Sequence, residues 1–237
     1  MAKLDGVRVA ILATDGVEQS EYTRPRKALE EEGAYVRLVA PSGGTIQAFH
    51  HFDKGEELTV EATLGEADPD DYDAVMLPGG ALNADQLRMD EDARRFVQAA
   101  DEDGKPIAAI CHAPWVLISS RIVENRRLTG YFTVEDDVTN AGGNWEDAPT
   151  VRDDTLLTSR GPADIPAFND AMIELFGDMH AGRFPADRPG KKGVRKPNKR
   201  VEQSIHLTGK RGTLTMEGAP EYKAGLSGRY PGQRCRS

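Results

Sequence analysis

The chain has 237 residues, of which 38% are hydrophobic, 29% charged and 6% aromatic. This composition is sufficient for a packed core, while the longest apolar runs, at residues 7–13 and 106–111, are far too short to span a bilayer. We therefore expect a soluble protein without a membrane-spanning helix. Residues 1–6 contain no apolar signal core, so the sequence predicts a cytoplasmic protein.

The net charge of −9 is unevenly distributed and divides the chain after Gly177. Residues 178–237 contain 14 Lys and Arg against 5 Asp and Glu, a net charge of +9, which leaves −18 for residues 1–177. The C-terminal part is rich in Gly and Pro and lacks apolar periodicity, so it cannot bury a core of its own. The sequence predicts a folded domain at 1–177 and a basic extension at 178–237. A solvated tail is the favoured interpretation, and docking on the acidic body or attraction of nucleic acid are the alternatives.

Buried strands alternate with amphipathic helices along residues 7–177. Continuous apolar runs, typical of parallel strands buried on both faces, occur at residues 7–14, 35–40, 73–77 and 107–111. Helices are expected at 20–32, 90–103, 112–123 and 163–176, a short hairpin within 41–63, and late strands at 150–159. This alternation predicts an α/β sandwich with a mostly parallel central sheet and right-handed crossovers. Ligands bind beyond the carboxyl ends of such strands, so residues 15–18, 78–80 and 111–112 should converge.

Cys111 ends a buried strand and directly precedes a helix, with Ala109 and Ala113 two positions to either side. Small residues at these positions allow the sharp strand-to-helix turn of a nucleophile elbow. We expect a lowered pKa for this thiol, because unsatisfied amide groups at a helix N-terminus favour the thiolate. The competing interpretation is an inert thiol that closes a core strand. The other cysteine, Cys235, lies in the basic extension and is expected to be exposed.

His112 is the natural proton carrier for Cys111, although adjacent side chains pair only where the elbow is strained. Glu18 is predicted either to hydrogen-bond His112 or to face the sulfur as a protonated acid. The backbone amides of Gly79, Gly80 and His112 are expected to stabilise an oxyanion, because glycine permits close backbone approach. The structural alternative for His112 is an ordinary residue of a first helical turn, and for Glu18 an exposed loop acid. For Gly79 and Gly80 it is an ordinary glycine turn.

Metal binding is another chemistry to weigh, because His50, His51 and Asp53 lie close together in the sequence. Their spacing matches no specific zinc motif, and the chain contains no phosphate-loop motif. We therefore predict no metal and no obligatory cofactor. The two histidines are interpreted as residues at the rim of the site.

The segment IAAICHAPW at residues 107–115 resembles the nucleophile segment of the DJ-1/PfpI family, part of the class I glutamine amidotransferase-like superfamily. DGVE at 15–18 is similar to the family's first loop with its buried acid, and LPGG at 77–80 to its oxyanion loop. The PfpI branch, also called the intracellular protease or general stress protein branch, is resembled by NAGGNW at 140–145, TSR at 158–160 and DIPAF at 164–168. These ordered motifs cover residues 5–177.

The resemblance implies a flavodoxin-like three-layer sandwich in which Cys111 is the nucleophile, His112 its partner and Glu18 the acid beside the sulfur. It also implies a homo-oligomer, a dimer or a hexamer, in which an acid from a neighbouring subunit orients the histidine. Asp85 stands at that place and is one methylene shorter than the glutamate of some members. Ala113 replaces the usual Gly, and Thr-Gly-Tyr at 129–131 replaces the more usual Thr-Ser-Trp or Thr-Ser-Tyr, so we expect altered substrate access.

The activity implied by this resemblance is that of a stress-related cysteine hydrolase or lyase. Cys111 would attack an electrophilic carbon and His112 would carry the proton. Family members have been assigned peptidase, glyoxalase and deglycase activities, and an aldehyde or its adduct on a protein or nucleotide is favoured here because no feature marks a long peptide groove. The alternative is a non-catalytic redox sensor or chaperone, in which Glu18 stabilises oxidised Cys111. A third hypothesis, nucleic-acid binding through residues 178–237, is weakened by the charge of −18 on the body.

Overall fold

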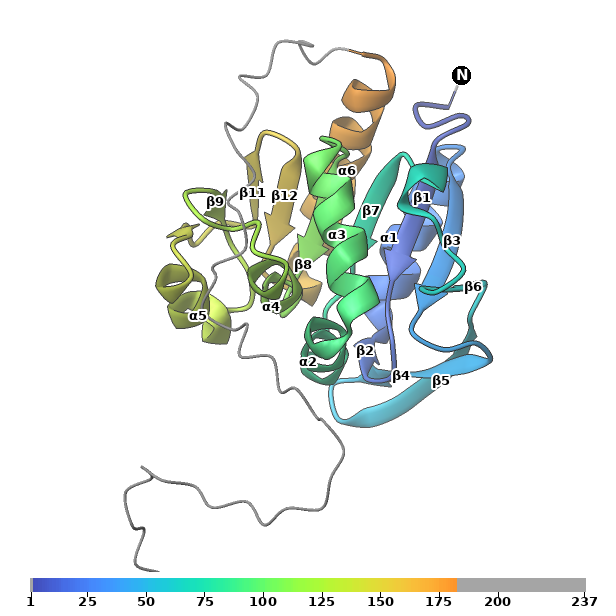
Figure 1. Cartoon of the computed structure of the whole chain (residues 1–237), viewed down its shortest axis with the longest axis horizontal. Coiled ribbons are helices and arrows are strands. Elements are labelled where there is room, and N and C mark those ends of the chain that lie inside the picture. The colour runs from blue at the N-terminus through green and yellow to red at the C-terminus, as the bar shows by residue number, and fades with distance from the viewer. Residues whose placement is uncertain (1, 183–237) are drawn as a thin grey trace, which may run out of the picture. The chain divides into compact units, whose positions relative to one another are not determined.

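A mostly parallel seven-stranded sheet forms the centre of the computed structural model, which describes residues 2–182 (Figure 1). The strand order is β11-β12-β8-β7-β1-β3-β6. The strands are β1 (Arg8–Leu12), β3 (Tyr35–Ala40), β6 (Ala62–Thr63), β7 (Ala74–Leu77), β8 (Ile107–Ile110), β11 (Thr150–Asp153) and β12 (Leu156–Ser159). All neighbouring pairs are parallel except β11 and β12, which form an antiparallel hairpin at one edge. The predicted α/β sandwich with a mostly parallel sheet is confirmed.

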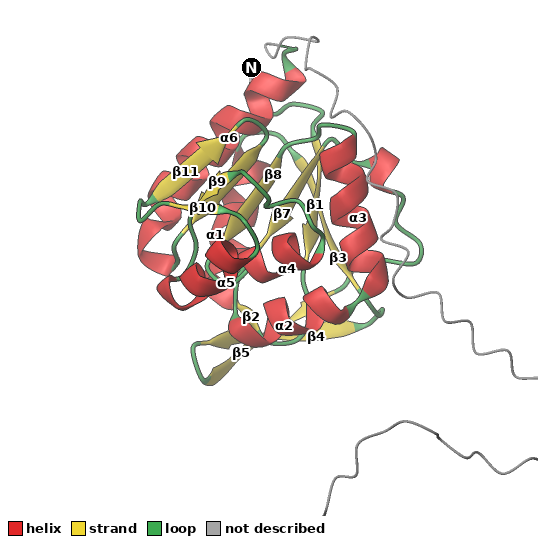
Figure 2. Cartoon of the chain, turned by 60° about the vertical axis from the view of Figure 1, so that its left-hand side comes forward, coloured by secondary structure: helices red, strands yellow, loops and turns green. Residues whose placement is uncertain are grey.

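Helices cover both faces of this sheet, with α1 (Gln19–Glu31) and α6 (Ile165–His180) on one face. The other face is covered by α2 (Ala81–Met89), α3 (Glu91–Glu102), α4 (Pro114–Ser119) and α5 (Glu135–Asn140) (Figure 2). Alternate residues of β1 serve the two cores, because side chains in a strand point to opposite faces. Val9 and Ile11 pack beneath α1 and α6, while Ala10 and Leu12 pack beneath α3. The continuous apolar run in the sequence therefore supplies two cores at once.

A smaller three-stranded sheet lies at the carboxyl end of the central strands, next to α2 (Figure 1). It contains β2 (Val17–Glu18), which pairs in parallel with β4 (Thr45–His50), and β5 (Asp53–Thr59), which pairs antiparallel with β4. The hairpin expected within residues 41–63 is therefore present. A second small sheet joins β9 (Arg127–Leu128) to β10 (Asn144–Trp145), and short 3-10 turns occupy Pro69–Asp71, Phe132–Val134 and Pro162–Asp164.

Four helices depart from the pattern expected from the sequence. Helix α4 begins at Pro114 instead of residue 112, because residues 111–113 form a tight turn before proline occupies the first helical turn. Helix α5 was not expected, and neither was helix α2. Its apolar residues Leu82 and Met89 are 61% and 76% exposed, so they do not mark one buried face. The last helix continues three residues beyond the predicted boundary at Gly177, and residues 183–237 lie outside the described part of the chain.

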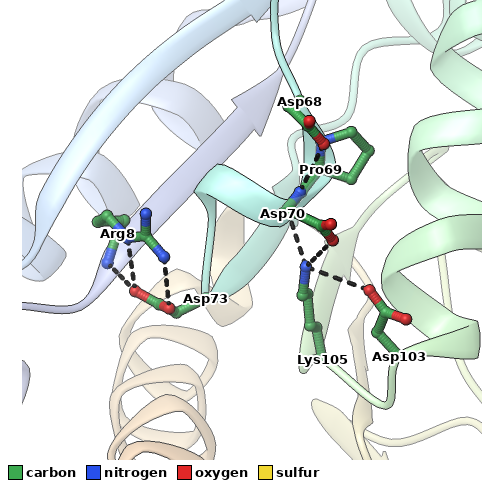
Figure 3. A network of polar contacts seen from close by, with 7 residues as sticks. All are labelled: Arg8, Asp68, Pro69, Asp70, Asp73, Asp103 and Lys105. Atoms are coloured by element: carbon green, nitrogen blue, oxygen red, sulfur yellow. Dashed lines mark hydrogen bonds and ion pairs between the residues drawn. The ribbon is translucent and has the colours of Figure 1, made fainter.

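Charged side chains gather at the amino end of the central strands, opposite the carboxyl end (Figure 3). Arg8, at the start of β1, binds Asp73 through Nε at 3.2 Å and Nη2 at 3.1 Å. Lys105, which precedes β8, lies 3.4 Å from Asp70 and 3.3 Å from Asp103. Exposed ion pairs of this kind contribute about 1 kcal/mol or less each. Among residues 2–182, no helix is long and apolar enough to cross a membrane.

Candidate active site

Cys111 occupies a sharp turn between β8 and α4 and has a left-handed backbone, with φ of 64°. This conformation costs a non-glycine residue about 1–3 kcal/mol and persists only where surrounding contacts hold it. Two backbone hydrogen bonds do so here. The Cys111 amide donates to the Ser159 carbonyl at 3.0 Å, and the Cys111 carbonyl accepts from the Tyr131 amide at 2.7 Å. The turn presents a side chain that is only 6% exposed, in the manner expected of a nucleophile elbow.

The elbow brings the neighbouring side chains of Cys111 and His112 together. Cys111 Sγ lies 3.1 Å from His112 Nδ1, which is hydrogen-bonding distance. The imidazole is stacked on Tyr131 with ring centroids 4.8 Å apart, and it meets Trp115 edge-on at 5.2 Å. Burial lowers the pKa of His112, so the ring is neutral near pH 7 and can accept a proton.

Glu18 does not contact the sulfur, contrary to the prediction. Its carboxylate accepts a hydrogen bond from the His51 amide at 2.9 Å, in the turn of the β4–β5 hairpin, and another from the Ser20 hydroxyl at 3.1 Å, in the first turn of α1. His50 Nδ1 lies 3.9 Å from the same carboxylate. Glu18 ends β2, and this position directs its side chain to the paired strand β4. It therefore fastens the hairpin, and the two histidines belong to that turn.

The acid beside Cys111 is Glu21, one helical turn further along the chain. It is fully buried in the first turn of α1, and its Oε2 accepts a hydrogen bond from the Gly79 amide at 2.9 Å. The pKa of Glu21 is raised to about 8, chiefly by burial and also by the charge of Glu18, while contacts with Cys111 and the Gly79 amide oppose the rise. Glu21 is therefore mostly a neutral acid at pH 7. Its Oε1 has no hydrogen-bond partner among residues 2–182, so the protonated acid has no competing acceptor on that oxygen.

The sequence contains a signal for Glu21 in the spacing of the residues that follow it. Glu21, Pro25 and Leu29 follow each other at four-residue intervals, and Pro25 and Leu29 lie on the buried face of α1. A glutamate on that face near a strand end must be protonated or paired, because an isolated buried carboxylate is costly. The helical period thus marks Glu21 as a buried acid, while its partners come from distant parts of the chain.

Burial raises the pKa of the Cys111 thiol, and a negative Glu21 would raise it further, while the amides of Gly80 and His112 oppose the rise. The lowered pKa expected from a helix N-terminus is therefore wrong for the free site. Helix α4 begins only at Pro114 and has six residues, so its first amides do not outweigh desolvation of the sulfur. Cys111 is a thiol at rest and depends on His112 to remove its proton.

Only two of the three predicted oxyanion donors face the sulfur. The amides of Gly80 and His112 hydrogen-bond Cys111, whereas the Gly79 amide is occupied by Glu21. Glycine is required at position 79 for a steric reason instead, because a Cβ there would overlap the Glu21 carboxylate and lie 2.5 Å from Cys111 Cβ. Gly80 has φ of 91°, which favours glycine.

Asp85 lies on the exposed side of α2, and its contact with His112 of a neighbouring subunit stays a prediction. Within the described chain, the acceptor near the outer nitrogen of the imidazole is Thr133, whose Oγ1 lies 3.4 Å from Nε2. No three His, Cys, Asp or Glu side chains of residues 2–182 come together in a group that could hold a metal ion.

Together, a three-layer α/β sandwich, a cysteine on a strained strand-to-helix turn, a paired histidine and a buried neutral acid define a class of proteins with a thiol-centred site. The model of the DJ-1/PfpI family matches residues 7–175. The chain belongs to this family.

Curated relatives carry several functional names. The putative cysteine protease YraA of Bacillus subtilis is 38% identical over 168 residues, which cover 71% of this chain and 97% of that protein. Deglycase TK1284 of Thermococcus kodakarensis is 37% identical, covering 71% and 99%, and general stress protein 18 of Bacillus subtilis is 38% identical, covering 72% and 98%. These names support an enzymatic activity in the family.

Solved structures agree with the fold. A two-domain protein from Anabaena variabilis, with DJ-1/ThiJ/PfpI-like and ferritin-like domains, has a TM-score of 0.69 at 31% identity, covering 79% of this chain. This chain spans 52% of that protein. DJ-1 of Schizosaccharomyces pombe has a TM-score of 0.64 at 20% identity, covering 76% of this chain and all of that one, and shows the likeness of fold alone.

Proposed function

We propose that the chain is a cysteine-dependent hydrolase or lyase that acts on reactive aldehydes or on their early adducts with proteins or nucleotides. The observation that carries this proposal is the 3.1 Å contact between Cys111 Sγ and His112 Nδ1, beside the buried acid Glu21. Two of the relatives described above are named as a deglycase and a putative cysteine protease, so a peptide bond is the other electrophile to test.

The first step transfers the thiol proton from Cys111 Sγ to His112 Nδ1 as the sulfur attacks the carbonyl carbon. A carbon–sulfur bond forms, the carbonyl π bond breaks, and its electron pair becomes an alkoxide. We assign the stabilisation of this charge to the amides of Gly80 and His112, which hydrogen-bond Cys111, and the His112 imidazolium returns the proton to the alkoxide oxygen. Neutral Glu21 adds no negative charge beside the thiolate.

Methylglyoxal tests this scheme because its conversion to lactate adds one water and requires no redox partner. Cys235→Ser protein, which removes the thiol of the extension, should consume methylglyoxal and form lactate. The same protein with Cys111→Ala should lose turnover at least 100-fold. Turnover that survives Cys111→Ala would refute the proposal. Absence of turnover in both proteins would direct the search to peptide substrates.

A redox sensor or chaperone is the second candidate, and the neutral Glu21 favours it specifically. A protonated carboxyl group can donate a hydrogen bond to an oxidised sulfur, whereas a carboxylate would repel it. Mass spectrometry after graded peroxide treatment separates the two candidates. A sensor forms sulfinate at Cys111 with no aldehyde turnover, and Glu21→Leu should then reduce the yield of sulfinate.

The assembly, the cellular location and the extension remain proposals. A homo-oligomer, either a dimer or a hexamer, would bring Asp85 of one subunit to His112 of another, and light scattering with Asp85→Asn tests this arrangement. The proposed location is the cytoplasm. Nucleic-acid binding by the basic residues 178–237 should disappear when they are deleted and should weaken with added salt.

A further inference from the structure

The segment that carries Thr133 is fastened directly to the Cys111 elbow. The Thr129 amide donates to Thr158 Oγ1 at 2.8 Å in the core, and the Tyr131 amide donates to the Cys111 carbonyl at 2.7 Å. The Val134 amide then closes a short turn on the Tyr131 carbonyl at 2.9 Å. Val134 itself is fully buried. Residues on both sides of Thr133 are therefore held by the core and the elbow.

Gly130 shows how closely this segment approaches the site. A Cβ at Gly130 would lie 3.0 Å from the Cys111 carbonyl oxygen and 2.8 Å from Pro114 Cγ, so only glycine allows the chain to pass here without displacing the elbow. The close passage places the next residues along the imidazole of His112. Tyr131 stacks on the ring, and Thr133 Oγ1 lies 3.4 Å from Nε2 at its outer edge.

The two nitrogens of His112 have different tasks in this geometry. Nδ1 can take the Cys111 proton only if its lone pair is free, which requires the ring proton of neutral His112 to lie on Nε2. A hydroxyl oxygen facing Nε2 accepts that proton's hydrogen bond and so favours the required tautomer.

We propose that Thr133 is a positioning residue of the same chain that holds His112 in the Nε2–H tautomer, which leaves Nδ1 free to take the Cys111 proton. The 3.4 Å contact is long for a neutral pair and should shorten when His112 becomes an imidazolium, because charge-assisted hydrogen bonds are shorter. The proposal deepens the proposed function. Its test reads the imidazole and thiol themselves, so it can fail or succeed independently of any substrate.

The experiment uses the full chain with Cys235→Ser and compares Thr133→Val, Thr133→Ser and Thr133→Ala. Thr139→Val is the matched control, because Thr139 is an exposed threonine on α5. It replaces a threonine hydroxyl by a methyl group, as Thr133→Val does, but away from His112. Nitrogen-15 NMR reports which ring nitrogen of His112 carries the proton, with His112→Asn to identify the signal. The rate of Cys111 alkylation by iodoacetamide, followed by mass spectrometry at pH 7, reports proton removal from the thiol.

We expect the parent and Thr139→Val to show the Nε2–H tautomer. Thr133→Val and Thr133→Ala should give mixed tautomers and alkylation roughly 5-fold slower, the effect of losing one hydrogen bond. Thr133→Ser should restore the rate to within about 2-fold and restore the tautomer.

Asp85→Asn is the decisive comparison. An unchanged tautomer and rate in Thr133→Val and Thr133→Ala would overturn the proposal, and loss of both properties in Asp85→Asn would assign the role to the neighbouring subunit. The proposal would also be overturned if Thr133→Ser failed to restore the tautomer and the alkylation rate. The volume of the threonine side chain, and not its hydroxyl group, would then explain the effect. Correct tautomer results together with no aldehyde turnover would leave the positioning role intact and refute the aldehyde substrate alone.

Discussion

Replacing Glu21 by Gln should make the protein's stability much less dependent on pH. The folded chain raises the pKa of Glu21 to about 8 through burial, from an ordinary value of 4.5. Between these two pH values the folded state binds a proton that the unfolded state has released. The free energy of unfolding therefore falls as pH rises through this window. The loss begins near pH 4.5 and is complete above about pH 8.

The two pKa values correspond to a loss of about 5 kcal/mol across the window, as an upper estimate. Gln is neutral at every pH and keeps an oxygen for the Gly79 amide, so Glu21→Gln should unfold with similar free energy at pH 4.5 and at pH 8.5. The measurement is urea unfolding of both proteins at half-unit steps of pH. The variant should be more stable than the parent by several kcal/mol at pH 8.5 and by little at pH 4.5.

Glu66→Gln provides the control of opposite sign. Hydrogen bonds from the side chain and amide of Thr63 lower the pKa of Glu66, so its stabilising effect is present above the ordinary pKa and is lost in acid. A stability difference between the parent and Glu21→Gln that is constant from pH 4.5 to 8.5 would refute a neutral Glu21. The assignment of the acid beside the sulfur would then fail with it.

Three further outcomes follow from the same geometry. Because burial raises the pKa of Cys111, its alkylation should accelerate with pH through the alkaline range. His112→Asn should slow alkylation roughly 10-fold or more at pH 7, because the proton acceptor is lost. An alkylation rate that is already constant below pH 8 would contradict the raised pKa. Gly79→Ala should lower the free energy of unfolding by about 1–3 kcal/mol or more through overlap with its neighbours. Gly161→Ala is the matched control, because the Gly161 backbone is extended and the new methyl would lie 3.8 Å and 3.9 Å from the nearest atoms. Equal thermal stability of the two variants would argue against the close approach of Gly79 to Glu21 and Cys111. Glu18→Ala should speed amide hydrogen exchange in the β4–β5 turn, because Glu18 accepts the hydrogen bond of the His51 amide there. Cys111 alkylation should change less than about 3-fold, and a large loss of thiol reactivity would restore Glu18 to the site.

The sequence by itself determined the features that rest on local pattern. Continuous apolar runs predicted the central strands, because a parallel strand covered on both faces must be apolar at every position. The small residues around Cys111 predicted the elbow, because backbone bulk limits how sharply a chain can turn. The ordered motifs identified the family, which the match to residues 7–175 confirms.

Tertiary structure decided which acid meets the sulfur. Glu18 and Glu21 are three residues apart, at the end of β2 and in the first turn of α1. Their separation arises because pairing of β2 with β4 directs Glu18 to the hairpin, while packing of α1 on the sheet directs Glu21 to Gly79, 58 residues away. Neither contact is encoded within a window of sequence.

The ionisation of the site was likewise decided by packing. A cysteine before a helix predicts a lowered pKa from local dipoles, but the folded chain buries Cys111 and begins α4 three residues later. Desolvation then outweighs the amide groups. The same burial makes Glu21 a neutral acid and His112 a neutral base. A pKa depends on all the groups and solvent within several ångströms of the titrating atom, and these come from segments that only the folded chain brings together.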